Sequence, residues 1–141
     1  GPMAAAAGTL FIERASRRDA LRVVHQIAES LKSGDTVAVF PEGTTSLGDT
    51  VLPFHANLLQ AAVTTQVPIQ PVLIRYVDDQ GARAPHVQYV DDDSLLASLW
   101  RVLCAPQTLV SVNWAQPQTA QGRDRRTWAQ DLRQVMLDLM R

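Results

Sequence analysis

Apolar residues recur at helical spacing in several separate segments of this chain. From residue 19 to residue 33 they return every three or four positions, which predicts an amphipathic helix that Gly34 ends. Ser16 and Asp19 stand at its start like a capping box, with aspartate in the place of the usual glutamate. The same spacing predicts further helices over residues 58–63, 95–103 and 128–139.

Short runs rich in β-branched residues separate these helices. They predict strands over residues 9–13, 36–40, 67–77, 86–90 and 108–114, with a turn at 78–81 and a hairpin joining the third and fourth strands. The first two strands flank a helix, an order typical of a parallel pair joined by a right-handed crossover. We therefore expect an α/β fold with a mixed, largely parallel sheet flanked by helices.

Composition restricts the class of protein. The chain has 141 residues, 46% of them hydrophobic, and a formal net charge of −1, which fits one globular domain and argues against binding nucleic acid. Cys104 is the single cysteine, so we expect a reducing compartment and an inert core thiol. No run approaches the ~20 apolar residues of a membrane helix. Residues 1–7 are interpreted as a cleavage remnant (Gly1 and Pro2) with a short leader, and 8–141 as a single domain.

Polar residues that suit an anion follow the first two predicted strands. Arg14 ends the first strand, and the loop 41–46 follows the second. Ligands of α/β sheets gather at the carboxyl ends of strands. A guanidinium can grip a phosphate with two hydrogen bonds, and Gly43 lets backbone amides approach an anion. The residues alone therefore predict a site for a phosphorylated small molecule, although Arg14 could instead pair with a nearby carboxylate and Gly43 could simply serve a tight turn.

The sequence FPEGTTS, residues 40–46, resembles the FPEGTRS block of the glycerolipid acyltransferase family, the lysophosphatidic-acid acyltransferase-like enzymes. Other blocks of that family follow in the correct order. GTLFIER at 8–14 is similar to its G-x-I-F-I-D-R block, LPFHANLLQAA at 52–62 to its L-P-F-K-x-G stretch, and VPIQPV at 67–72 to its V-P-I-x-P-V block. The resemblance therefore covers residues 8–72 and implies a glycerol-3-phosphate acyltransferase-like fold.

The resemblance implies transfer of a fatty acyl group from an acyl thioester to a hydroxyl of a lysophospholipid or glycerol-phosphate acceptor, in phospholipid biosynthesis. It implies that Arg14 binds the acceptor's phosphate, and that Glu42 orients Arg14 or receives the acceptor hydroxyl. The implied substrate-binding residues are Arg14, Glu42, Gly43, Thr44, Thr45, Ser46 and His55. Phe40, Pro41, Pro68 and Pro71 would support the site, the last two by fixing a strand beside the thioester.

The sequence departs from the family pattern at three places. Thr45 replaces an arginine, and His55 replaces a lysine in a stretch that also lacks its glycine, which suggests a different acceptor head group. The family's catalytic His-x-x-x-x-Asp block belongs ahead of Gly8, where the chain has no such block. We therefore expect an amino-terminally truncated, inactive carboxyl-terminal portion. His86 and Asp91 have the same spacing but stand after the other blocks, on a predicted strand whose positions five apart face opposite sides.

The expected partners follow from the same resemblance. The donor would be acyl-CoA or acyl carrier protein, no cofactor or metal is implied, and the full-length protein would work at the cytoplasmic face of a membrane, with this fragment soluble. Loss of part of the sheet predicts self-association across an uncovered edge. Trp100 is expected in the core rather than at a membrane surface. Two alternatives remain: a non-catalytic module that binds phosphate or lipid head groups, and a domain completed by a partner chain.

Overall fold

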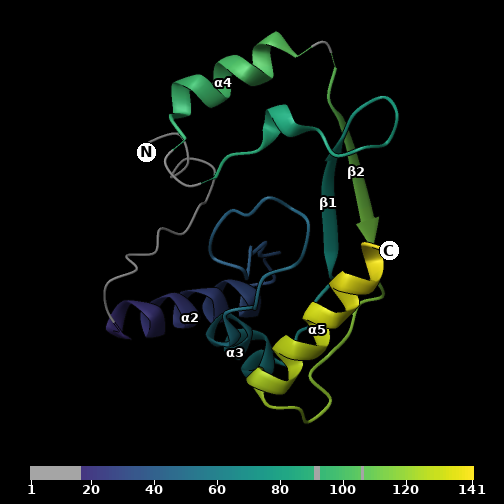
Figure 1. Ribbon diagram of the computed structural model, residues 1–141. Helices are drawn as coiled ribbons and strands as arrows, with labels where there is room; N and C mark the ends of the chain where they lie inside the picture. The colour runs from purple at the N-terminus through teal and green to yellow at the C-terminus, as the bar shows by residue number, and fades with distance from the viewer. Residues whose placement is uncertain (1–16, 91–92, 106) are drawn as a thin grey trace.

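The structure is a computed structural model that describes residues 17–90, 93–105 and 107–141. The predicted strand at 9–13, Arg14 and Ser16 lie outside these residues. Helices pack at one end of the molecule, and a two-stranded ribbon extends from them to a further helix (Figure 1). The elements, in chain order, are α2 (Arg17–Lys32), α3 (Ala56–Thr65), β1 (Val72–Val77), the 3₁₀ helix η1 (Pro85–Val87), α4 (Leu95–Cys104), β2 (Leu109–Trp114) and α5 (Arg125–Leu139).

The helical spacing in the sequence correctly predicted all four α-helices of the described residues. α3 packs against both α2 and α5, and its two sides contribute to two apolar clusters (Figure 1). Leu59 and Ala62 meet Trp128 and Leu132 of α5, and Ala61 meets the buried residues of α2. Gly34 follows α2 with a φ of 88°, a left-handed conformation that glycine adopts at little cost.

The amino terminus of α5 is fixed by polar contacts around its buried tryptophan. Asp124 caps the helix by accepting from the N–H of Arg126 and of Thr127. Arg123 donates to the carbonyls of Thr119 and Ala120, pairs with Asp131 at 2.7 Å, and lies 5.8 Å from the centre of the Trp128 ring. These contacts hold α5 in one position, and the middle and end of this helix reach the candidate site.

The described strands form an antiparallel pair. β1 pairs with β2 in a register that sets Val72 opposite Trp114 and Val77 opposite Leu109. The described residues therefore contain both helices and a small sheet, which is compatible with the predicted α/β class. The parallel part of the expected sheet and its glycerol-3-phosphate acyltransferase-like arrangement stay predictions, because the first predicted strand lies outside the described residues. Residues 36–40 are not assigned as a strand, and no described segment pairs with them.

The prediction of a hairpin strand at 86–90 is wrong. The chain returns along β1 only briefly, through an N–H···O bond from Ala84 to Tyr76 and a bridge between Arg83 and Val77. Pro85 then interrupts the pairing because it has no N–H to donate, and η1 begins there. His86 lies on this short helix, where its Nε2 is 2.6 Å from the Thr108 hydroxyl; Asp91 lies outside the described residues.

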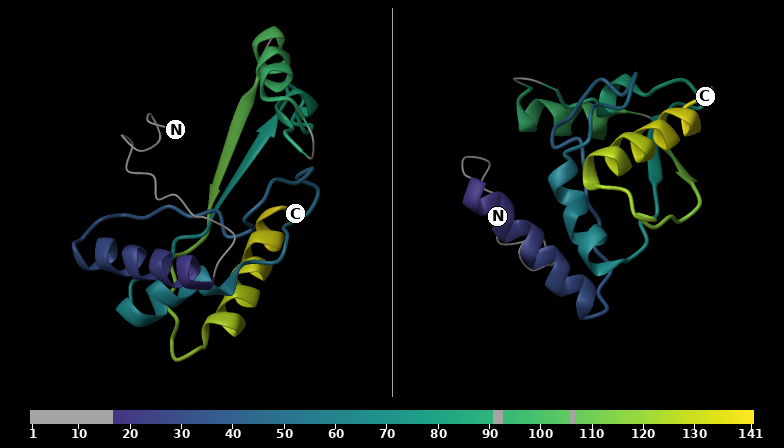
Figure 2. Two further views of the ribbon diagram at one scale, coloured as in Figure 1. Left: turned by 90° about the vertical axis from the view of Figure 1, so that its left-hand side faces the viewer. Right: turned by 90° about the horizontal axis from the view of Figure 1, so that it is seen from below.

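The expectation of a buried face on the helix at 95–103 is also wrong. Trp100 is 69% exposed, and Cys104 is exposed rather than an inert core thiol. The physical reason is that α4 packs mainly against η1, well away from the helices that form the two apolar clusters (Figure 2). The side of α4 that carries its large apolar residues consequently has no described element against it.

Candidate functional site

The family-like block at residues 40–46 opens a loop that returns to the start of α3. The carboxylate of Glu42 accepts the Leu52 N–H at 2.7 Å, and the His55 N–H donates to the Pro41 carbonyl at 2.8 Å. These two bonds join the beginning of the loop to its end. Glu42 therefore has a structural partner ten residues along the chain, which the sequence analysis did not foresee.

Gly43 and His55 are in direct contact across the base of this loop. Gly43 has a φ of 68°, a conformation that residues with a Cβ adopt only with strain. A Cβ at this position would lie 2.6 Å from Cδ2 and 2.7 Å from Nε2 of His55. Glycine is thus needed twice here, for the backbone conformation and for the imidazole that packs on it.

The hydroxyl residues of the block lie on the exposed part of the loop. Thr44 and Thr45 are exposed, and Ser46 is half-buried. The Ser46 hydroxyl accepts the Gly48 N–H at 3.2 Å, which shapes the turn that follows. Since Thr44 and Thr45 face solvent, their hydroxyl groups are available to a ligand at this edge.

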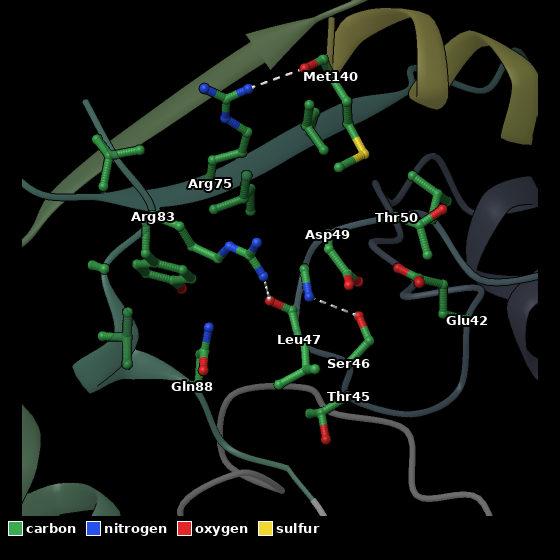
Figure 3. Close-up of a pocket in the computed structure, with 18 of the residues that line it drawn as sticks. Glu42, Thr45, Ser46, Leu47, Asp49, Thr50, Arg75, Arg83, Gln88 and Met140 are labelled. Carbon is green, nitrogen blue, oxygen red and sulfur yellow. Dashed lines mark hydrogen bonds between the residues drawn. The ribbon is translucent and has the colours of Figure 1, made fainter.

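A groove of about 570 Å³ runs between this loop and the β1 ribbon. Glu42, Thr44, Thr45 and Ser46 line one side, and β1, the turn after it and η1 line the other (Figure 3). Met136 of α5 and Met140, directly after this helix, also line the groove. The structure therefore brings most of the predicted loop residues to a single concave surface, a form typical of small-molecule sites.

Two arginines that the sequence analysis missed lie in this groove. Arg83 Nη1 donates to the Leu47 carbonyl at 2.6 Å, which connects the turn after β1 to the loop (Figure 3). Arg75 Nη1 donates to the Met140 carbonyl at 3.4 Å. Arg75 is the one charged residue in the run 72–77, and the signal in the sequence was the strand geometry, in which neighbouring residues such as Ile74 and Tyr76 face the opposite side.

The far end of the loop is anchored to α5. Arg133 Nε donates to the carbonyl of Val51 at 2.9 Å, and Val51 is buried. The loop is thus held at both ends and near its middle by Glu42, Arg83 and Arg133. A loop fixed in this way keeps the backbone and hydroxyl groups that line the groove in a defined arrangement.

The remaining predicted residues do not line the groove. Gly43 and His55 are not among the residues that line it, and they contact each other at the base of the loop. Phe40 is exposed, as is Pro68, whereas Pro71 is buried and its carbonyl accepts the Ala115 N–H at 3.1 Å. Arg14 lies outside the described residues, so its place at the site stays a prediction. Within the described part of the chain, no cluster of His, Cys, Asp and Glu could hold a metal ion.

Comparison with known proteins gives the context for this groove. The family model described as Acyltransferase matches residues 1–75. A lyso-ornithine lipid O-acyltransferase of Pseudomonas aeruginosa is 36% identical over 136 residues, 96% of this chain and 52% of the relative. A 1-acyl-sn-glycerol-3-phosphate acyltransferase of Neisseria gonorrhoeae is 37% identical over 114 residues, 81% of this chain and 44% of the relative.

A mammalian protein is also similar to part of the chain. The human 1-acyl-sn-glycerol-3-phosphate acyltransferase alpha is 39% identical over 74 residues, which is 52% of this chain and 26% of the relative. No solved structure matches the chain. The chain spans about half the length of the first two relatives. These matches confirm the resemblance carried by the motif blocks: the chain belongs to the Acyltransferase family, among the acyltransferases of glycerolipid metabolism.

Proposed function

We propose that this chain forms the acceptor-binding part of an acyltransferase that moves a fatty acyl group from an acyl thioester to a lipid hydroxyl. The observation that carries the proposal is the groove, because the family-like residues Glu42, Thr44, Thr45 and Ser46 line it together with two arginines. The acceptor would be a lysophospholipid, a glycerol phosphate or a lyso-lipid of related shape, as the names of the relatives suggest.

Two arginines line the groove beside the carboxylates of Glu42 and Asp49, and these arginines offer donors to an anionic head group. The guanidinium groups of Arg75 and Arg83 each make one hydrogen bond to a backbone carbonyl in the described structure. A guanidinium has several further N–H donors, arranged to meet a phosphate or carboxylate with two parallel bonds. In the proposal these groups, together with Arg14, replace the arginine that the family has at the position of Thr45.

Glu42 has a supporting part in this proposal. A carboxylate repels a phosphate, and its Oε2 already accepts the Leu52 N–H at 2.7 Å. Glu42 therefore holds the loop in shape, and Gly43 keeps the loop in contact with His55. His55 would influence the choice of head group indirectly, through the position of the loop.

The reaction requires a base for the acceptor hydroxyl. In the proposal a histidine outside the printed sequence, oriented by an aspartate, takes the hydroxyl proton while the oxygen attacks the thioester carbonyl. The new C–O bond forms, the C–S bond breaks, and the thiolate of coenzyme A or acyl carrier protein leaves and is protonated. The chain's own residues would bind and orient the acceptor, and the chain alone would be inactive or nearly so. No cofactor takes part beyond the thioester.

The complete protein would carry out this reaction at the cytoplasmic face of a membrane, where its lipid substrates reside. Self-association of the chain stays a prediction. Sedimentation that shows a monomer at every concentration tested would contradict it.

The test is acyl transfer from a radiolabelled long-chain acyl-CoA to lysophosphatidic acid and, separately, to a lyso-ornithine lipid. The printed chain is compared with an amino-terminally extended version that includes a His-x-x-x-x-Asp block. We expect activity only in the extended version. There, Arg83→Ala should raise the KM for the acceptor at least tenfold, whereas Arg126→Ala, which removes an exposed arginine on α5 away from the groove, should not.

Other results have definite meanings. Activity of the printed chain would contradict the assignment of the base to residues outside it, and His86 and His55 would then be mutated first. An equal effect of Arg83→Ala and Arg126→Ala would contradict the assignment of the groove. If neither version transfers an acyl group, the catalytic proposal fails. Acceptor binding without transfer would then favour the module that binds phosphate or lipid head groups.

A further inference from the structure

The helix α4 turns its large apolar side chains outward. Five of its ten residues are large apolar side chains that are 52% to 77% exposed. They stand at positions one, two, five, six and nine of the helix, a spacing that places them on one side. Among the described helices, α4 has the most exposed large apolar residues. They are Leu95, Leu96, Leu99, Trp100 and Leu103.

The opposite side of α4 carries the two polar residues of the helix, Ser98 and Arg101. Ser98 is its buried residue, at 8% exposure. Arg101, the single charged residue of the helix, pairs with Asp93 at 2.8 Å and donates to the Gln88 carbonyl at 2.6 Å. This polarity is the reverse of an ordinary surface helix, which buries its apolar side. Polar contacts thus set the orientation of α4 and leave its apolar side uncovered.

The position of α4 relates this side to the groove. α4 packs against η1, and Val87, Gln88 and Tyr89 at the end of η1 line the groove. The helix lies at the far end of the β1–β2 ribbon, away from α2, α3 and α5 (Figure 2). η1 therefore connects α4 to the groove, and the outer side of α4 is remote from the helices of the two apolar clusters.

We propose that the outward side of α4 docks into the head-group region of a lipid layer that carries little net charge. The charge pattern supports this occupant. Arg101 stands on the other side of the helix and is paired with Asp93, so the docking side itself has no cation for an anionic lipid to pair with. The indole of Trp100 is largely apolar and has one N–H donor, a combination that suits the boundary between acyl chains and water.

A second copy of the chain fits this side less well than lipid does. A helix of ten residues is about 15 Å long and about 10 Å wide. Pairing through such a surface alone falls well below the ~800 Å² that each partner buries in a stable complex. A lipid layer has no such requirement, because an amphipathic helix lies in it with its apolar side buried.

In this inference α4 is the element that brings the groove to its lipid substrate. The inference rests on the proposed function only in explaining why the protein would bind lipid. Binding to lipid can be measured without any acyl transfer. Failure of the acyl-transfer assay would therefore leave this inference standing, and absence of lipid binding would leave the acyl-transfer proposal standing.

The first experiment is co-sedimentation of the chain with vesicles of phosphatidylcholine. We expect the wild type to bind, with an affinity that changes less than twofold between low and high salt. Leu96→Glu should lower the partition coefficient at least tenfold. The matched control is Leu21→Glu, which places the same charge on α2 at a leucine that is 72% exposed, and it should bind like the wild type.

The second experiment locates the contact without adding a charge. In a Trp114→Phe background, Trp100 is the tryptophan that brominated phosphatidylcholine should quench, because Trp128 is fully buried. Absence of binding by the wild type, equal loss in both glutamate variants, or binding without quenching would each overturn the proposal. So would a stable dimer that Leu96→Glu dissociates, since a second copy would then be the occupant.

Discussion

The contact between Gly43 and His55 makes a prediction that separates backbone strain from side-chain crowding. Gly43 has a φ of 68°, and a Cβ there would lie 2.6 Å from Cδ2 of His55. Gly43→Ala should therefore be destabilising for two reasons. Gly48 provides the control, because it has a φ of 75° in the same loop but has no atom within 4 Å of an added Cβ.

The two effects have different magnitudes. A left-handed conformation is unfavourable by about 1–2 kcal/mol for an L-residue, and the loss of unfolded-state freedom returns ~0.4–1 kcal/mol. Gly48→Ala should therefore lower the free energy of unfolding by about 1 kcal/mol. In Gly43→Ala the imidazole must also leave its position. His55 is exposed and can rotate, which adds about 1 kcal/mol for a strained side-chain torsion and gives a total of about 2 kcal/mol.

The assay is urea unfolding followed by tryptophan fluorescence and circular dichroism. A difference of about 1 kcal/mol between the two alanine variants corresponds to a shift of about 0.5 M in the midpoint. In a His55→Ala background the two variants should have the same effect, because the crowding is removed while the strain remains. The N–H of residue 55 still donates to Pro41 in that background. Equal costs of Gly43→Ala with and without the imidazole would refute the crowding argument, and a neutral Gly48→Ala would refute the strain argument.

Three further predictions concern stability. Glu42→Ala removes the acceptor of the Leu52 N–H and should lower the free energy of unfolding by about 2 kcal/mol in urea titrations, with a smaller loss in Glu42→Gln. Asp124 accepts hydrogen bonds that lower its pKa. The bond from the Thr127 hydroxyl has the largest effect, followed by those from the N–H groups of Arg126 and Thr127. Its stabilising contribution is therefore present above the unfolded pKa of an aspartate and lost as the pH falls through the lower folded pKa, so Asp124→Asn should flatten thermal stability measured across the acidic range. Trp128→Ala empties a fully buried site and should lower the free energy of unfolding by about 3–5 kcal/mol, and an unchanged melting transition would contradict the core described above.

The sequence by itself determined the helices, the turn at 78–81 and the family. A helix makes its hydrogen bonds between residues four apart, so the spacing of apolar residues such as Val24, Ile27 and Leu31 was enough to predict α2. Asp78 likewise accepts from the N–H groups of Gln80, within the turn, and Ala82, directly after it. The motif blocks gave the family because they are local strings, and the residues Glu42, Thr44, Thr45 and Ser46 did come together at one groove.

Only the tertiary structure decided the features that depend on distant partners. The pairing of β1 with β2, the 3₁₀ helix in place of a hairpin strand, and the entry of Arg83 into the groove all depend on which segments meet. The same holds for α4, whose spacing predicted a helix but whose apolar side faces outward because Ser98 is buried and Arg101 binds Asp93 and Gln88. Periodicity shows that a helix has two sides, and it does not show which of them the rest of the chain will cover. That choice is made by long-range contacts, and their free energy is not encoded in any single segment.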